Sequence, residues 1–163
     1  MLLPPEKQDW FPNLSSGAYR VTSPEDWDYN CIAHAADMDA ASVAEYFWWP
    51  DEDYFWPDGI PREETLEAFI LAYQRVGYQP CENGDLEPGV QKVAIYVDQF
   101  RDHRPTHAAR QLESGKWTSK LGPWEDIEHS TPDDVAGYRG SEARYGTVAQ
   151  YLKRPFFYEG GLP

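Results

Sequence analysis

Hydrophobic spacing changes from helical to strand-like about half-way along the chain. Over residues 63–76 the apolar side chains recur at intervals of three and four and form one helical stripe: Leu66, Phe69, Ile70, Tyr73 and Val76. Pro61 before this segment and Gly77 after it are typical of a helix start and a helix end. The spacing therefore predicts a helix over residues 63–76.

The second half of the chain has the short apolar runs and turn residues of an antiparallel sheet. Ser114-Gly115 separates two such runs and predicts a β-hairpin with a two-residue turn. The expected strands are Ala18–Thr22 near the N-terminus, then Lys92–Val97, Thr106–Leu112, Lys116–Leu121 and Tyr145–Leu152. A helical half before an antiparallel half predicts the α+β class, with N-terminal helices packed on an antiparallel sheet.

The length of the chain and its N-terminus fit one soluble domain. We expect residues 1–163 to form a single domain, in which residues 1–28 are an irregular N-terminal segment that wraps the core. The N-terminus lacks the basic and apolar regions of a signal peptide, and no run approaches the ~18 apolar residues of a membrane span. Two cysteines make no disulfide framework in a domain of this size, although a Cys31–Cys81 bridge stays open. A reducing cytoplasm is the expected location.

The charge is strongly one-sided, with 28 acidic against 14 basic side chains and a net charge of −14. It argues against nucleic acid and against anionic membranes, because both need a basic surface. Two interpretations stay open: the charge keeps an aromatic-rich protein soluble, or it attracts a basic partner protein.

Cys31 is the first candidate for chemistry. A helix is expected to begin near Asn30 or Cys31, because Asp28 and Asn30 are N-cap residue types. The partial positive charge of a helix start lowers the pKa of a thiol, and the thiolate is the nucleophile. The alternative is a small buried hydrophobic residue, which is what most free cysteines are.

His107 lies on the predicted strand 106–112 and could act as the base for that thiol. A nucleophilic cysteine needs a base that is close in space rather than in sequence, and a strand packed on the Cys31 helix would provide one. The alternative is a core or surface histidine without a chemical role.

The order of these features resembles the papain-like thiol hydrolases, and among them the NlpC-type amidases and peptidases. A cysteine at a helix start, a second helix, Leu86-Glu87-Pro88-Gly89 leading into the strand Lys92-Val93-Ala94-Ile95-Tyr96, and a histidine strand follow in the same order. Several segments also resemble a small uncharacterised bacterial family without an established activity: Phe11-Pro12-Asn13-Leu14, Tyr29-Asn30-Cys31-Ile32-Ala33, Trp48-Trp49-Pro50, His107-Ala108-Ala109-Arg110-Gln111 and Ser119-Lys120-Leu121-Gly122.

The resemblance implies a third residue that orients the histidine from the next strand. With a two-residue turn, position 107 would face 122, and Lys120 would share its face. Lys120 has no acceptor for an imidazole N–H, so two interpretations stay open for it: a residue that binds a substrate carboxylate, or a solvated strand residue without a role in the site. Asp126 and His129, just beyond, have suitable chemistry, and Asp126 is the first choice.

The chain departs from the papain pattern just before Cys31. Papain-like enzymes place a glutamine there for the oxyanion, whereas this chain has Glu25, Asp26, Trp27 and Asp28. Acids at this position would repel an oxyanion and raise the thiol pKa. The backbone N–H groups of Cys31 and Asn30 are the substitutes that we expect, and His34, one helical turn later, would line the same cleft.

Seven aromatic residues lie within positions 46–56 and could wall a substrate groove. We expect Trp48, Trp49 and Trp56 to contribute to it; the alternative is a satellite core that fixes a long connection. The pairs Cys31-x-x-His34 and His103-x-x-x-His107 have the spacing of metal ligands but lie far apart, so no metal or other cofactor is expected.

The leading hypothesis is a cysteine hydrolase acting on a peptide or other amide bond, with Cys31 as nucleophile, His107 as base and Asp126 or His129 as orienting residue. The competing hypothesis is a non-catalytic, acidic protein-binding module, immunity-like or inhibitor-like. A weaker third possibility is a glycan-binding domain.

Overall fold

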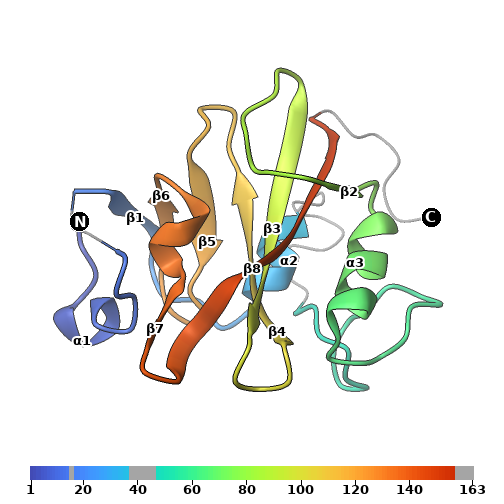
Figure 1. The fold of residues 1–163 in the computed structure, drawn as a ribbon, viewed down its shortest axis with the longest axis horizontal. Coiled ribbons are helices and arrows are strands. Elements are labelled where there is room, and N and C mark those ends of the chain that lie inside the picture. The colour runs from blue at the N-terminus through green and yellow to red at the C-terminus, as the bar shows by residue number, and fades with distance from the viewer. Residues whose placement is uncertain (15–16, 37–46, 157–163) are drawn as a thin grey trace.

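The computed structural model describes residues 1–14, 17–36 and 47–156. Its strands are β1 (Tyr19–Ser23), β2 (Gln79–Cys81), β3 (Val90–Asp98), β4 (Arg104–Gln111), β5 (Trp117–Lys120), β6 (Asp126–His129), β7 (Gly137–Arg139) and β8 (Glu142–Pro155). Seven of them lie side by side in the order β1-β6-β5-β4-β3-β8-β2, and β7 pairs with β8. All pairs are antiparallel. The sheet curves into a half-barrel (Figure 1).

The predicted fold class, helices packed on an antiparallel sheet as in papain-like and NlpC-type enzymes, is wrong. The described part of the chain is mostly β, and its helices are short: α1 (Pro5–Gln8), α2 (Cys31–Ala36), α3 (Leu66–Gln74) and the 3-10 turn η2 (Pro132–Val135). No helix in the described ranges is long and apolar enough to cross a bilayer.

Two side-chain caps explain where the main helices begin. The Thr65 hydroxyl accepts a hydrogen bond from the Ala68 N–H, at 3.2 Å, and starts α3 three residues later than the sequence predicted. The Asn30 side-chain oxygen accepts from the Ala33 N–H, at 3.0 Å, so that α2 begins at Cys31, as expected. The N-cap of α2 thus fixes the position of the candidate nucleophile.

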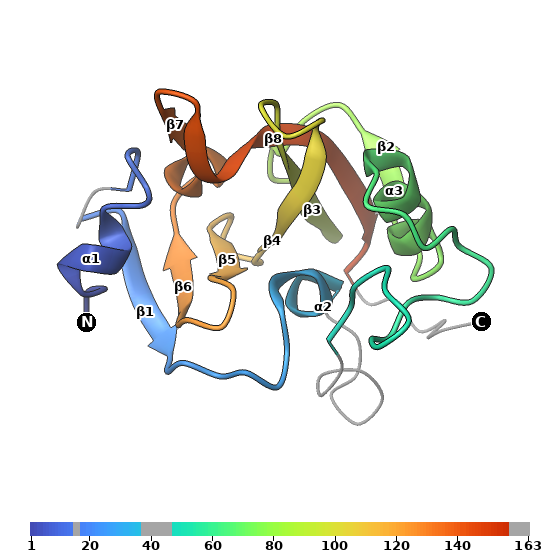
Figure 2. The same ribbon diagram turned by 90° about the horizontal axis from the view of Figure 1, so that it is seen from below.

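Each face of the sheet carries its own hydrophobic core, because successive strand residues point to opposite sides. The first core lies between the sheet and the helices α2 and α3, and it includes Cys31, Ile32, Phe69, Tyr73, Ile95 and Ala108. The second core lies on the other face and includes Phe11, Tyr96, Ala109, Trp117, Ile127 and Tyr145. Figure 2 shows α2 on one side of β4 and β5, with β7 and η2 on the other.

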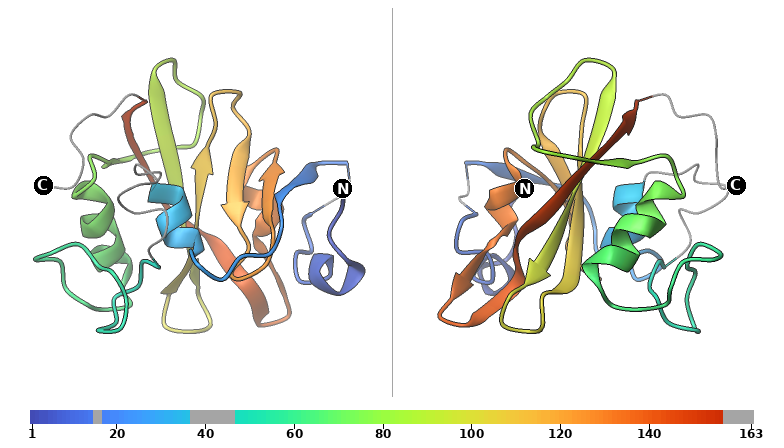
Figure 3. Two further views of the ribbon diagram at one scale, coloured as in Figure 1. Left: turned by 180° about the vertical axis from the view of Figure 1, so that it is seen from behind. Right: turned by 45° about the vertical axis from the view of Figure 1, so that its right-hand side comes forward.

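The long strand β8 pairs with β3 along most of its length and contributes to both cores, with Leu152 in the first and Tyr145 in the second (Figure 3). At Gly146 the backbone has φ 86°, and a Cβ atom there would lie 2.0 Å from the Val97 carbonyl oxygen. Only glycine fits such an approach at such a φ. The neighbouring residue, Tyr145, is thereby held in the second core, against His107.

Candidate active site

Cys31 lies at the start of α2, against the backbone of β4. It is a free thiol that is 6% exposed. Its Sγ lies 4.0 Å from the Thr106 carbonyl oxygen, and the Ala108 N–H points to the same sulfur. The two peptide groups that flank His107 in the chain therefore both face Cys31. The structure thus brings the predicted nucleophile to the strand of the predicted base.

His107 itself points into the second core and is fully buried. Its ring stacks on Tyr145 with centroids 3.9 Å apart and meets the edge of Tyr96 at 5.1 Å. No hydrogen bond joins its Nδ1 to any described residue, Cys31 included. Cys31 thus contacts the backbone of β4 on one face, while the His107 ring lies on the other face, and no hydrogen bond joins the predicted dyad in this structure.

The other ring nitrogen of His107 belongs to a buried chain of hydrogen bonds. His107 Nε2 lies 3.0 Å from Ser119 Oγ on β5, and Ser119 Oγ lies 2.8 Å from His129 Nε2 on β6. His129 Nδ1 lies 2.8 Å from the Thr131 carbonyl oxygen. We call these three side chains, His107, Ser119 and His129, the relay.

The relay fixes which nitrogen of each ring carries the proton. Burial lowers the pKa of His107 and of His129, so both rings are neutral near pH 7. A carbonyl only accepts, so His129 Nδ1 is the donor to Thr131, and its Nε2 accepts from Ser119. Ser119 has a single O–H, so its oxygen accepts from His107 Nε2–H. His107 Nδ1 is consequently an unprotonated nitrogen with a free lone pair.

The sequence missed Ser119, and the hairpin register explains why. The observed pairs are Arg110–Thr118 and Gln111–Trp117, joined by a three-residue turn instead of the predicted two-residue turn. A shift of one residue exchanges the two faces of a strand. Ser119 therefore shares the face of His107, and Lys120 lies on the opposite face.

Asp126, the preferred third residue, does not orient His107. Its Oδ2 accepts a hydrogen bond from the Tyr29 hydroxyl at 2.6 Å, and its Oδ1 lies 3.9 Å from Lys120 Nζ. These contacts lie on the α2 side of the sheet, because Asp126 pairs with Lys120 in register. His129, the second choice, is the one that connects to His107.

The residues predicted to bind substrate divide into two groups. Asn30 and His34 have structural contacts: Asn30 binds the backbone N–H and carbonyl of Trp48, and His34 Nε2 lies 3.0 Å from Thr118 Oγ1. Trp48 and Trp56 are buried in the first core, and Trp49 packs edge-on against Phe69. These tryptophans form the satellite core of the alternative interpretation; position 46 lies outside the described residues.

Burial also sets the state of the nucleophile. It raises the pKa of Cys31 to about 11, while the peptide N–H groups around the sulfur and the Lys120 ammonium oppose this rise. The expectation of a lowered thiol pKa at the helix start is therefore wrong, because desolvation outweighs the short helix. In this structure the thiol is thus neutral and so is the imidazole, and the two side chains lie on opposite faces of β4.

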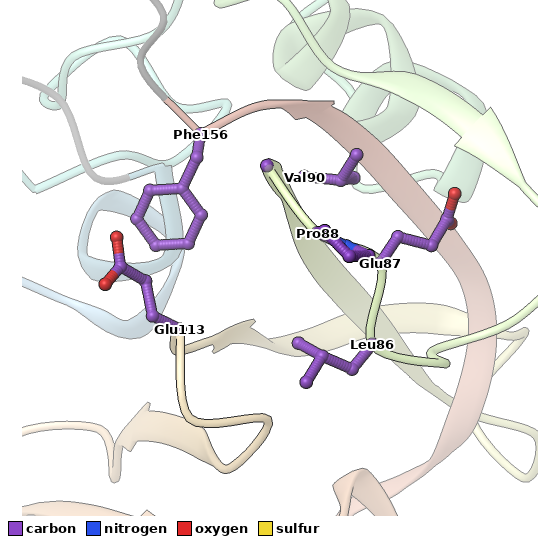
Figure 4. A pocket seen from close by; sticks show the side chains of 7 residues that line it. Leu86, Glu87, Pro88, Val90, Glu113 and Phe156 are labelled. Atoms are coloured by element: carbon purple, nitrogen blue, oxygen red, sulfur yellow. The ribbon is translucent and has the colours of Figure 1, made fainter.

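Four cavities lined by described residues lie away from Cys31 and His107. The one in Figure 4, of about 460 Å³, has apolar walls from Leu86 and Phe156 and a carboxylate from Glu113. Neither Cys31 nor His107 lines any of the four. Within the described ranges, no three His, Cys, Asp or Glu side chains are placed to hold a metal ion.

A family model described as a domain of unknown function (DUF7689) matches residues 20–153. The chain belongs to this family. The matched region includes Cys31 and the whole relay. No curated protein sequence and no solved structure matches the chain.

Proposed function

We propose that the protein is a cysteine hydrolase that cleaves an amide bond, with Cys31 as nucleophile and His107 as general base. The observation that supports it is the free lone pair on His107 Nδ1, left by a relay that fixes the other nitrogen as a donor. A thiol hydrolase requires this arrangement: one imidazole nitrogen is oriented, and the other accepts the thiol proton.

The reaction begins with general-base catalysis, because the resting thiol is protonated. The two groups lie on opposite faces of β4 in this structure, so the proposal requires a rearrangement that brings His107 Nδ1 to Cys31 Sγ. His107 Nδ1 then takes the proton as Cys31 Sγ attacks the carbonyl carbon of the amide. The imidazolium then donates that proton to the leaving amine, and water hydrolyses the thioester that remains. Ser119 and His129 hold the ring during both transfers, and no cofactor is required.

The test uses p-nitrophenyl acetate, a small activated ester that needs no specific substrate groove. Wild-type protein is expected to release p-nitrophenol with turnover, while Cys31→Ala and His107→Ala reduce the rate at least ~100-fold. Cys81→Ser is the matched control and retains the rate, because Cys81 is not part of the proposed dyad and its Sγ contacts the Asn83 carbonyl oxygen. Equal rates in all four proteins would sink the proposal.

A second candidate function, binding of a basic partner protein, is favoured by the net charge of −14. A basic partner would release counter-ions from such a surface, so its affinity would fall steeply with salt. The absence of ester turnover together with salt-sensitive binding of a lysine-rich peptide would favour this function. For either function we place the protein in the cytoplasm, and the two free cysteines support a reducing compartment.

A further inference from the structure

Lys120 is a buried cation on the Cys31 side of the sheet. Its side chain is 0% exposed, and its Nζ donates a hydrogen bond to the Trp124 carbonyl oxygen. The ammonium lies 4.9 Å from the centre of the Tyr29 ring. Burying an ammonium carries a large desolvation penalty, which is offset only where negative charge or acceptors surround it.

The partners in the described ranges compensate this charge incompletely. Trp124 O is the hydrogen-bond acceptor for an ammonium that has three N–H donors. The Asp126 Oδ1 at 3.9 Å is too distant for a hydrogen bond and has no other partner in the described part of the chain. Lys120 therefore retains capacity to stabilise further negative charge.

The register of α2 on β5 places this cation beneath Cys31. His34 contacts Thr118, and Tyr29 contacts Lys120, so the α2 segment runs along β5 from Lys120 toward Thr118. Thr118 and Lys120 lie on one face of β5, about 7 Å apart. Cys31 lies between Tyr29 and His34 in the chain, and its Sγ faces Thr106 and Ala108 of β4, the strand that pairs with β5.

We propose that Lys120 is the charge partner of Cys31: its ammonium stabilises the negative charge on the sulfur when the thiol proton leaves. The inference deepens the proposed hydrolase and rests on it. Other titratable groups near the pair are Asp26, Glu125 and Asp126 around Lys120, and Tyr73 and Tyr145 around Cys31. The Lys120 charge lowers the thiol pKa, opposing the effect of burial.

The alternative role for Lys120 is structural, since its Nζ also joins the turn at Trp124 to Asp126. A structural role predicts a loss of stability on substitution, without an effect on the ionisation of Cys31. The two roles therefore separate in the pH dependence of thiol alkylation.

The experiment follows Cys31 alkylation by iodoacetamide between pH 7 and 10, by mass spectrometry, in a Cys81→Ser background. Only thiolate reacts, so below the pKa the rate falls tenfold for each unit by which the pKa rises. We expect Lys120→Met to slow alkylation about tenfold at each pH, because the loss of a nearby positive charge raises the pKa of the thiol. Lys120→Arg should restore most of the rate.

Lys116→Met is the matched control on the same hairpin. Lys116 is exposed and pairs with Glu128, so its loss should leave the alkylation profile unchanged. If Lys120→Met does not fold, the double variant Lys120→Met/Asp126→Asn removes both buried charges and should still react slowly. A wild-type rate in either Lys120→Met protein overturns the inference.

The alkylation test is independent of the hydrolase test, because alkylation needs neither substrate nor turnover. If Cys31 alkylation depends on Lys120 but no ester is cleaved, the hydrolase falls and the charge pairing stands. If ester turnover depends on Cys31 while alkylation ignores Lys120, the charge pairing falls and the hydrolase stands.

Discussion

At the scale of single residues, one hydroxyl connects two buried neutral histidines and links their tautomers. Ser119 accepts from His107 and donates to His129, so its single proton sets both tautomers. The carbonyl of Thr131 gives this chain its direction, since it accepts and never donates. The free lone pair on His107 is thus the consequence of a backbone oxygen two residues beyond His129.

We expect Ser119→Ala to destabilise the protein and to release the His107 tautomer. The substitution leaves two buried ring nitrogens without partners, each costing about 1–3 kcal/mol. Urea unfolding measures the loss, and ¹⁵N NMR of the imidazoles should show a mixture of tautomers at His107. Ser141→Ala, at an exposed turn, is the control and should change neither quantity. An unchanged ¹⁵N spectrum for Ser119→Ala would refute the relay.

At the scale of elements, local patterns predicted most strands but not their pairing. The strands expected near residues 18–22, 92–97, 106–112, 116–121 and 145–152 are confirmed. Strand β6 was missed, because Asp126–His129 has three acids or histidines and one apolar residue, and no alternating run. The turn at Ser114-Gly115 was predicted correctly, but with two residues instead of three. This error in the register placed Lys120, instead of Ser119, on the same face of the sheet as His107.

The close approach of β8 to β3 at Gly146 can be tested by substitution. Gly146→Ala should lower the free energy of unfolding by about 1–3 kcal/mol beyond the strain of an alanine at positive φ, because its Cβ would collide with the Val97 carbonyl. Gly140→Ala is the matched control: it also has positive φ, 63°, but open space around it. We expect Gly140→Ala to lower the free energy of unfolding by about 1–2 kcal/mol. Equal midpoints of thermal unfolding for the two variants would contradict the close approach of β8 to β3.

At the scale of the whole molecule, the half-barrel depends on contacts that no local pattern specifies. The pairing of β1 with β6 and the insertion of β8 between β3 and β2 join distant segments. The stripe over residues 63–76 correctly indicated a helix, yet it said nothing of how small the helical layer is. Of the candidate site, Cys31, His107 and His129 could be identified by residue type, whereas Ser119 required the register.

The two buried histidines make the stability of the whole molecule depend on pH. Their pKa lies below the ordinary value of 6.5 in the folded state and returns to it on unfolding. Below pH 6.5 the unfolded chain binds more protons, so the free energy of unfolding should fall as the pH decreases. Urea titrations between pH 7.5 and 5.5 measure this slope, in a range where carboxylates stay ionised.

His129→Gln should flatten that slope, because an amide keeps hydrogen bonds without taking up a proton. His103→Asn is the control, since His103 is exposed and its positive φ of 52° suits asparagine. A wild-type free energy of unfolding that is constant from pH 7.5 to 5.5 would contradict burial of the neutral rings.

The pairing of β1 with β6 also sets the order in which the protein is completed during synthesis. Arg20 on β1 forms an ion pair with Glu128 on β6, across 108 residues of chain. Strand β1 therefore leaves the ribosome well before β6 and stays unpaired until β6 follows. Because His129 lies on β6, the catalytic chemistry that we propose stays switched off in the nascent chain until β6 has been translated.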